Sequence, residues 1–374
     1  MKSEFDYSIA DSQGTDVKPI EPQKFDIDAY QDYATSLLQR CSNFWHCKSG
    51  IAVYRRFRVP QVFSCGCKDM KLSLALQLGA LRESMKYAAD IPNFLEPWYG
   101  IGTVASAFGA DYEWPQGQAP AIKPPFQSVQ DALNYDLKPI EQTAIGKDTL
   151  TMIEYFIDMT KGKIPISLTD TQSPLNTASL IIDNNSLFMS FFDCPDDLKK
   201  LLQVITDLLV DFTKKQIELI GTPLVYPGHG FASSTVFKGL GMSDDCFLML
   251  SENQFLDFES QFLSKAGEPF DGVAFHCCGN WSAKAQAVKK IQKLVIADGA
   301  FSVQTDPNPN LPEPIRDTFT DTNVIINARM VGSEEIVFEK VKQLYKPGMK
   351  LIAVTYCKTP DEQKGLYKKI HSLI

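Results

Sequence analysis

The chain has 374 residues and a formal net charge of −8 at pH 7, with 44% hydrophobic and 22% charged residues. This length suffices for one large domain or two ordinary ones with a substantial core. The acidic balance argues against nucleic acid or an anionic membrane as a partner, and no apolar run approaches the roughly 20 residues that span a bilayer.

The first 24 residues are polar and acidic, and they contain no apolar segment of the kind that begins a secretory signal. We expect a flexible lead over residues 1–24, a single domain over residues 25–374 and a cytoplasmic location. Nine cysteines, an odd number, argue against a disulfide framework. Clustered cysteines are therefore better interpreted as metal ligands or nucleophiles.

Helical periodicity appears first at residues 26–45 and 71–90, and residues 110–140 are rich in Pro, Gly and Gln, which indicates a long surface excursion. Beyond this point, short apolar runs alternate with amphipathic segments. The apolar runs are 162–170, 179–193, 222–230, 271–280, 295–303, 323–330 and 349–357, and the amphipathic segments are 194–220, 252–267, 282–294, 333–345 and 359–373.

The apolar runs are continuous, which is typical of strands that are buried on both faces in a parallel sheet. An open doubly wound sheet and a closed barrel both fit this alternation of strands and helices. The chain length and the absence of a G-x-G-x-x-G after an early strand favour the barrel. The predicted fold class is α/β, a (β/α)8 TIM barrel with an N-terminal extension.

Polar groups follow three predicted strands: Asp170 after "PISLT", His276 and Cys278 after "GVAF", and Cys357 after "LIAVTY". Active sites of such barrels lie at the carboxyl ends of the strands, and His276 and Cys278 point to the same side because they are two residues apart. One imidazole and two thiolates suit zinc, and three protein ligands leave a fourth position for an exchangeable group. We predict a catalytic zinc held by His276, Cys278 and Cys357.

The remaining cysteines and the basic cluster have simpler interpretations. Buried cysteines usually act as small hydrophobic residues, and an H-x-C pair alone is a weak signal for a metal. Cys277 should point away from Cys278, into packing, and Cys65 and Cys67 have no nearby His or further cysteine pair, so we expect loop or core positions. The segment "YRRFR" (residues 54–58) is interpreted as a solvated strand edge rather than an anion site.

Several segments resemble the uroporphyrinogen decarboxylase superfamily, and more closely its zinc-dependent branch, the methylcobamide:thiol (coenzyme M type) methyltransferases. The resemblance implies a (β/α)8 barrel whose zinc is ligated by an H-x-C after one strand and a distant Cys after the last, here His276, Cys278 and Cys357. It is carried by "RFRVPQV" (56–62), "ASAFGADYEWP" (105–115), "CPDDLKKLLQVITDLL" (194–209), "MSDDCFLMLSENQFLDF" (242–258), "FHCCGN" (275–280) and "YCKTPDEQ" (356–363).

The chain departs from the decarboxylase branch in its N-terminal part. That branch carries an "R-Q-A-G-R-Y" segment that grips propionates, and "YRRFRVPQVF" does not match it. Seven arginines are few for holding a polyanionic tetrapyrrole. No D-x-H-x-x-G corrinoid motif is present, so the resemblance implies that a cobalamin would be supplied by a separate corrinoid protein.

These observations favour a zinc-dependent methyltransferase that moves a methyl group from a methyl-corrinoid to a small thiol activated on zinc. Asp170, Asp245 and His229 are candidates for orienting the thiol or protonated groups, although Asp245 fits a helix N-cap equally well. Gly279 and Asn280 are candidate cofactor-binding residues. The alternatives are a uroporphyrinogen decarboxylase-like lyase, with Asp170 near the pyrrole nitrogens, and a non-catalytic barrel that binds a corrinoid or tetrapyrrole.

Overall fold

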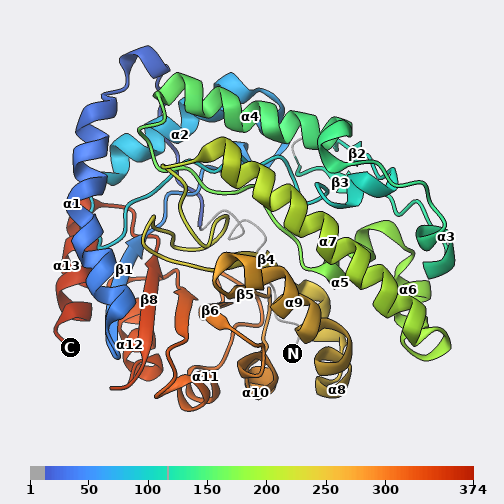
Figure 1. Ribbon diagram of the computed structural model, residues 1–374. Helices are drawn as coiled ribbons and strands as arrows, with labels where there is room; N and C mark the ends of the chain where they lie inside the picture. The colour runs from blue at the N-terminus through green and yellow to red at the C-terminus, as the bar shows by residue number, and fades with distance from the viewer. Residues whose placement is uncertain (1–12, 116–117) are drawn as a thin grey trace.

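The structure, a computed structural model, describes residues 13–115 and 118–374 (Figure 1). At its centre lies a six-stranded parallel sheet in the order β1-β8-β7-β6-β5-β4. Because every pair is parallel, the carboxyl ends of the strands meet at one edge, where ligands bind in such folds. The strands are Gly50–Arg55 (β1), Leu240–Ser243 (β4), Val273–His276 (β5), Leu294–Ala300 (β6), Ile325–Arg329 (β7) and Lys350–Thr355 (β8).

Two irregular extended segments close the ring between β1 and β4. The amide of Asp90 donates to the carbonyl of Val53 in β1 at 2.8 Å, which attaches the first segment to the sheet. Leu95 then forms a parallel bridge with Ile166 of the second segment. Gln172 of the second segment bridges Ser243 of β4 and completes the ring, and Ile166 also bridges Leu224 in the segment that precedes β4. Six regular strands and two irregular ones make the expected α/β barrel, so the predicted fold class is confirmed.

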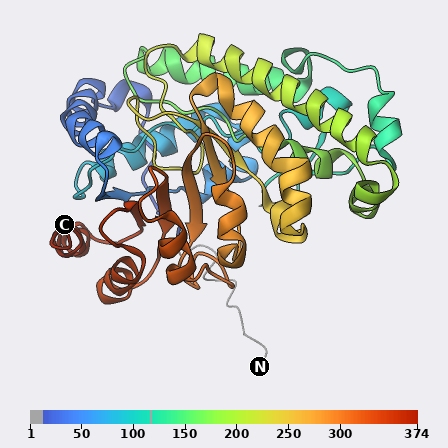
Figure 2. The same cartoon turned by 60° about the horizontal axis from the view of Figure 1, so that its bottom comes forward.

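Helices cover the outside of this ring (Figures 1 and 2). They are Ile27–His46 (α1), Met70–Ser84 (α2), Val129–Leu133 (α3), Ala144–Thr160 (α4), Pro174–Ile181 (α5), Asn184–Asp193 (α6), Pro195–Ile220 (α7), Glu252–Gln254 (α8), Ser260–Gly267 (α9), Ala285–Lys289 (α10), Pro312–Phe319 (α11), Glu334–Leu344 (α12) and Pro360–His371 (α13); a short hairpin of Tyr112–Glu113 (β2) and Ala121–Ile122 (β3) lies in the excursion. Within the described residues, no helix combines the length and the apolar character that crossing a membrane requires.

The helix predicted over residues 194–220 is confirmed by α7. Pro195 stands at its first position, where its missing N–H is harmless, and Asp196 and Asp197 complement the positive end of the helix dipole. The helix predicted over residues 282–294 is shorter than expected, because only α10 is regular and the chain turns through Lys293 (φ 58°) to enter β6.

Alternate residues of each strand pack into two separate hydrophobic clusters, because successive side chains of a strand point to opposite faces. In β8, Ile352 and Val354 belong to the cluster inside the ring of strands, together with Tyr356. Leu351 and Ala353 belong to the larger cluster between strands and helices. This alternation decides which groups at the strand ends face the interior of the barrel.

Part of the segment that we expect to be a flexible lead is described. The amide of Thr15 donates to the carbonyl of Arg58 at 2.8 Å, and the amide of Ile20 donates to the carbonyl of Ala75 in α2 at 2.8 Å. The Ile20 side chain is buried. Residues 1–12 lie outside the described residues, and the single domain over residues 25–374 stays a prediction.

A buried carboxylate joins the two ends of the chain to the barrel. Asp90 accepts hydrogen bonds from the amide of Val53 (2.8 Å), from the hydroxyl of Tyr367 (2.6 Å) and from Nε2 of His371 (2.8 Å), and Arg40 Nη1 lies 3.5 Å away. Burial raises the pKa of Asp90, but the bonds from His371 and Tyr367 outweigh burial, so the net pKa lies below its ordinary value. The cluster ties α1 and α13 to β1.

We expect Asp90→Asn to lower the free energy of unfolding by about 2–3 kcal/mol at neutral pH, since hydrogen bonds to a charged group contribute about 1.5–3 kcal/mol. A lowered pKa in the folded state stabilises above the unfolded value near ~3.9, and the effect is lost as the pH falls through the folded pKa. Urea unfolding should therefore show wild type and variant converging in acid. Asp211→Asn, at a carboxylate that is 73% exposed, is the control, and a pH-independent difference contradicts the assignment.

Candidate metal centre and polar network at the barrel mouth

His276 is the last residue of β5, and Cys278 follows two residues later. Their facing atoms, His276 Nε2 and Cys278 Sγ, lie 3.3 Å apart. Cys277 points the other way: it is fully buried in the cluster between strands and helices, and its thiol donates to the carbonyl of Cys278 at 3.1 Å. Burial raises the pKa of Cys277 well above its ordinary value. Cys278 is thus presented at the barrel mouth, and Cys277 is enclosed.

Asp245 joins His276 and Cys278. It begins the 3-10 helix Asp245–Met249 (η7), directly after β4. One ligand atom from each of the three residues lies within 4.8 Å of the other two, and the amide of Cys278 donates to Asp245 Oδ1 at 2.7 Å. A carboxylate oxygen, an imidazole nitrogen and a thiol sulfur form a donor set that zinc accepts.

Asp298 fixes the orientation of the His276 ring. Its Oδ2 lies 2.6 Å from His276 Nδ1, and only 1% of its side chain is exposed. Arg329 Nε donates to the same oxygen at 3.0 Å, and Asn327 Nδ2 donates to Oδ1 at 2.5 Å. Because Nδ1 is engaged by a carboxylate, Nε2 is the ring nitrogen left for a metal, an arrangement common among metal-binding histidines.

The charges of this pair reinforce one another. Burial lowers the pKa of His276, but Cys278 and Asp298 raise it more strongly, so that it reaches about 10. Burial raises the pKa of Asp298, but Arg329 and His276 outweigh burial and bring it down to about 2. These contacts favour the protonated ring, and a metal ion that binds at Nε2 must displace its proton.

Cys357, the third predicted ligand, is not brought into this group. It follows β8 on the outward side of the alternation, and it packs in the cluster between strands and helices. Its carbonyl accepts a hydrogen bond from Arg55 Nε at 2.8 Å, and burial raises the pKa of its thiol to about 11. Tyr356 takes the inward position instead. The sequence signal is strand alternation: Tyr356 follows Ile352 and Val354 in steps of two and faces inward with them, whereas Cys357 falls on the other face.

Asp170 and His229 form a second polar group, with residues that the sequence did not single out. His229 Nε2 lies 3.4 Å from Asp170 Oδ2, and His229 Nδ1 lies 2.7 Å from Glu96 Oε2. Trp98 Nε1 also donates to Asp170, at 2.9 Å, and Arg56 Nη2 lies 3.5 Å from Glu96 Oε1. One imidazole is thus held between two carboxylates.

The interpretation of "YRRFR" as a solvated strand edge is wrong, since Arg55 and Arg56 are only 3% and 7% exposed. Their guanidinium groups are satisfied inside the protein, by the Cys357 carbonyl and by Glu96. Burial raises the pKa of Glu96, but Arg56 and His229 outweigh burial and lower it to about 2. Glu96 is therefore ionised at neutral pH.

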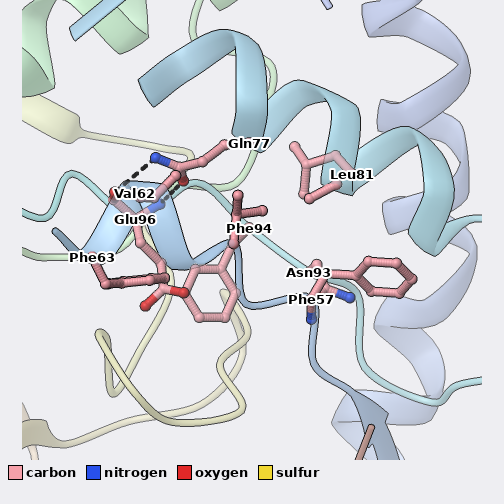
Figure 3. A pocket seen from close by; sticks show the side chains of 10 residues that line it. Phe57, Val62, Phe63, Gln77, Leu81, Asn93, Phe94 and Glu96 are labelled. Carbon is pink, nitrogen blue, oxygen red and sulfur yellow. Dashed lines mark hydrogen bonds between the residues drawn. The ribbon is translucent and has the colours of Figure 1, made fainter. Parts of the chain in front are cut away.

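A small enclosed cavity of about 10 Å³ lies beside Glu96 and is lined by Phe63, Asn93 and Leu81 (Figure 3). Gln77 borders it: its Nε2 donates to the Glu96 carbonyl at 3.0 Å, and its Oε1 accepts from the Glu96 amide at 2.7 Å. This volume is about that of one water. The cavity is therefore too small for a substrate, and its walls are residues that hold Glu96 in place.

A cavity of about 1040 Å³ lies at the carboxyl ends of β1, β7 and β8, and Tyr356, Cys357 and Arg55 are among its lining residues. It is large enough for a substantial organic ligand. Cys357 thus borders this cavity as well as packing in the cluster between strands and helices.

Gly279 and Asn280 shape the loop that carries Cys278. Gly279 has φ 78°, and its amide donates to Asp306 Oδ2 at 2.9 Å. Asn280 Oδ1 accepts from the amide of Ser282 at 3.0 Å. These contacts fix the loop, and a cofactor-binding role for Gly279 and Asn280 stays a prediction.

Comparisons with known proteins agree with this architecture. Residues 51–226 match the family model of uroporphyrinogen decarboxylase (URO-D), a range that contains Asp170 but ends before His229, Asp245 and His276. Among solved structures, a methyltransferase from Methanosarcina mazei shares the fold, with a TM-score of 0.61 and 12% identity over 90% of this chain and 98% of that chain. No curated protein sequence matches significantly. Residues 51–226 thus match the uroporphyrinogen decarboxylase family, and the chain as a whole shares the fold of this methyltransferase structure.

Proposed function

We propose that the protein is a zinc-dependent methyltransferase that moves a methyl group from a methyl-corrinoid to a small thiol. The observation that carries this proposal is the convergence of Asp245, His276 and Cys278 at the carboxyl edge of the barrel. The methyltransferase named among the similar structures supports the same reaction class. All nine cysteines are free, which agrees with the reducing cytoplasm as the place of reaction.

His276 and Cys278 are the first two proposed zinc ligands, and two residues compete for the third place. Asp245 is favoured by position, because its carboxylate already lies beside both partners. Cys357 is favoured by the resemblance, but it must turn from the outer cluster to reach them. In either case the protein supplies three ligands and leaves one position for the substrate, as catalytic zinc sites do.

A zinc ion in this place would lower the pKa of a substrate thiol, which makes it a nucleophile at neutral pH. The protein's own groups prepare that chemistry. Asp298 holds His276 so that Nε2 faces the open site. His229 lies between Glu96 and Asp170, so both of its ring nitrogens face carboxylates and it would act on substrates by positioning these two groups. The methyl-corrinoid would come from a separate protein, since the chain has no corrinoid motif.

The number of sulfur ligands decides between Asp245 and Cys357. We expect about one zinc per chain, and zinc-edge X-ray absorption should show sulfur near ~2.3 Å and nitrogen or oxygen near ~2.0–2.1 Å. One sulfur per zinc assigns the third position to Asp245, and Asp245→Ala should then weaken zinc binding while Cys357→Ala does not. Two sulfurs assign it to Cys357 and reverse the effect of these variants. Absence of sulfur contradicts the site altogether.

The two neighbouring cysteines provide a matched pair. Because Cys278 faces the open site and Cys277 is enclosed, Cys278→Ser should weaken zinc binding at least about tenfold. Cys277→Ser should leave zinc binding almost intact and change mainly the thermal stability. Zinc binding of the two variants is measured as metal content after dialysis and by competition titration with a chelator. Equal losses in the two variants would show that Cys277 also binds the metal.

The reaction itself is tested with methylcobalamin and a small thiol such as coenzyme M or 2-mercaptoethanol. We expect thiol-dependent loss of the methylcobalamin absorbance, abolished in Cys278→Ser and retained in Cys277→Ser. Circular dichroism checks that both variants fold. Demethylation that persists in folded, zinc-free protein contradicts the proposal, and decarboxylation of a porphyrinogen by the same preparation would support the lyase instead.

A further inference from the structure

The loop after β5 contacts η7 at both ends. At one end, the amide of Cys278 donates to Asp245 Oδ1 at 2.7 Å. At the other end, Lys284 is the last residue of the 3-10 helix Ser282–Lys284, and its side chain contacts main-chain carbonyls of η7. The segment that carries one proposed ligand, Cys278, therefore also holds the segment that carries another, Asp245.

The ammonium group of Lys284 is used entirely in this contact. Nζ donates to the carbonyls of Phe247 (3.2 Å), Leu248 (2.9 Å) and Leu250 (2.5 Å), and it lies 5.2 Å from the centre of the Phe247 ring. An ammonium has three N–H donors, so each has a carbonyl partner. Lys284 has no carboxylate partner in the described structure, and its charge meets the negative, carbonyl end of η7.

Between these two contacts the loop and η7 pack closely. A Cβ on Gly279 would lie 2.8 Å from Leu248 Cδ1, and Gly279 also has φ 78°, which other residues rarely adopt. Phe247 is fully buried. Three contacts thus hold η7: the buried side chain of Phe247, the close approach of Gly279 to Leu248, and the hydrogen bonds from Lys284 to its last carbonyls.

We propose that Lys284 is a positioning residue that sets the distance of the Asp245 carboxylate from His276 and Cys278, and so tunes the metal affinity of the site. This inference rests on the proposed function, with Asp245 as a ligand. When the three carbonyl bonds are lost, η7 can shift relative to the loop, and Asp245 shifts with it. His276 stays in place because β5 and Asp298 hold it, and the loop beside Cys278 is held by the Gly279 amide, which donates to Asp306 Oδ2 at 2.9 Å.

The test is a double-mutant cycle on metal affinity, using Zn²⁺ with a chelator competitor and Co²⁺ with its visible spectrum. Lys284→Met should weaken Zn²⁺ binding about tenfold, as loss of supporting groups around metal ligands does. In the Asp245→Ala background the same change should have no further effect, because Lys284 acts only through Asp245. Lys289→Met, at an exposed lysine of α10, is the matched control and should change nothing.

The Co²⁺ spectrum supplies a readout that a loss of stability alone would not move. The ligand-field bands of Lys284→Met should shift toward those of Asp245→Ala. Equal weakening in both backgrounds, or no weakening at all, overturns the role of Lys284. Wild-type protein that binds neither ion overturns the proposed function instead. If circular dichroism shows Lys284→Met to be unfolded, Lys284→Gln, which keeps two N–H donors, takes its place in the same cycle.

Discussion

The buried carboxylate of Asp298 is the interaction on which the rest of the barrel mouth depends. Its carboxylate lies against the His276 ring and the Arg329 guanidinium, and it accepts a hydrogen bond from the side-chain amide of Asn327. A carboxylate with 1% exposure is stable only when it is paired and fully hydrogen-bonded. The three partners come from β5 and β7, which lie on either side of β6, so this one group fixes the register of three strand ends and the direction of His276 Nε2.

From Asp298 the network extends to the other half of the mouth. Asn327 Oδ1 accepts the amide of Ala232 at 3.3 Å, and the ring of Phe231 packs edge-on against His276 with centroids 6.3 Å apart. Both residues follow His229 in the same loop. The imidazole between Glu96 and Asp170 and the imidazole beside Asp298 are therefore connected through the residues that follow His229.

Much of the architecture could be predicted from the sequence, because continuous apolar runs and capped amphipathic helices are local patterns. The strand expected over residues 179–193 is wrong, since this run forms the end of α5 and all of α6. The opposed directions of Cys277 and Cys278 follow from strand alternation. The partners of these groups could not be predicted. Asp245 reaches the site from the end of β4, and Arg56 pairs with Glu96 forty residues away. Cys357 lies two residues beyond the end of β8. At this point a shift of one residue along the chain decides whether a side chain faces the inside of the ring or the surrounding helices.

The two sides of the barrel are built with unequal stiffness. From β4 through β8 to β1 each strand pairs with its neighbour over several consecutive residues, with one register shift between β5 and β6, whereas Leu95 and Ile166 are joined by an isolated bridge. His276, Asp298 and Arg329 belong to these paired strands, and Glu96 and Asp170 belong to the two irregular segments. A backbone shift at Glu96 or Asp170 therefore disturbs fewer inter-strand hydrogen bonds than a shift at His276, Asp298 or Arg329. The candidate metal group and the Glu96–His229–Asp170 group thus stand on parts of the same ring that differ in main-chain support.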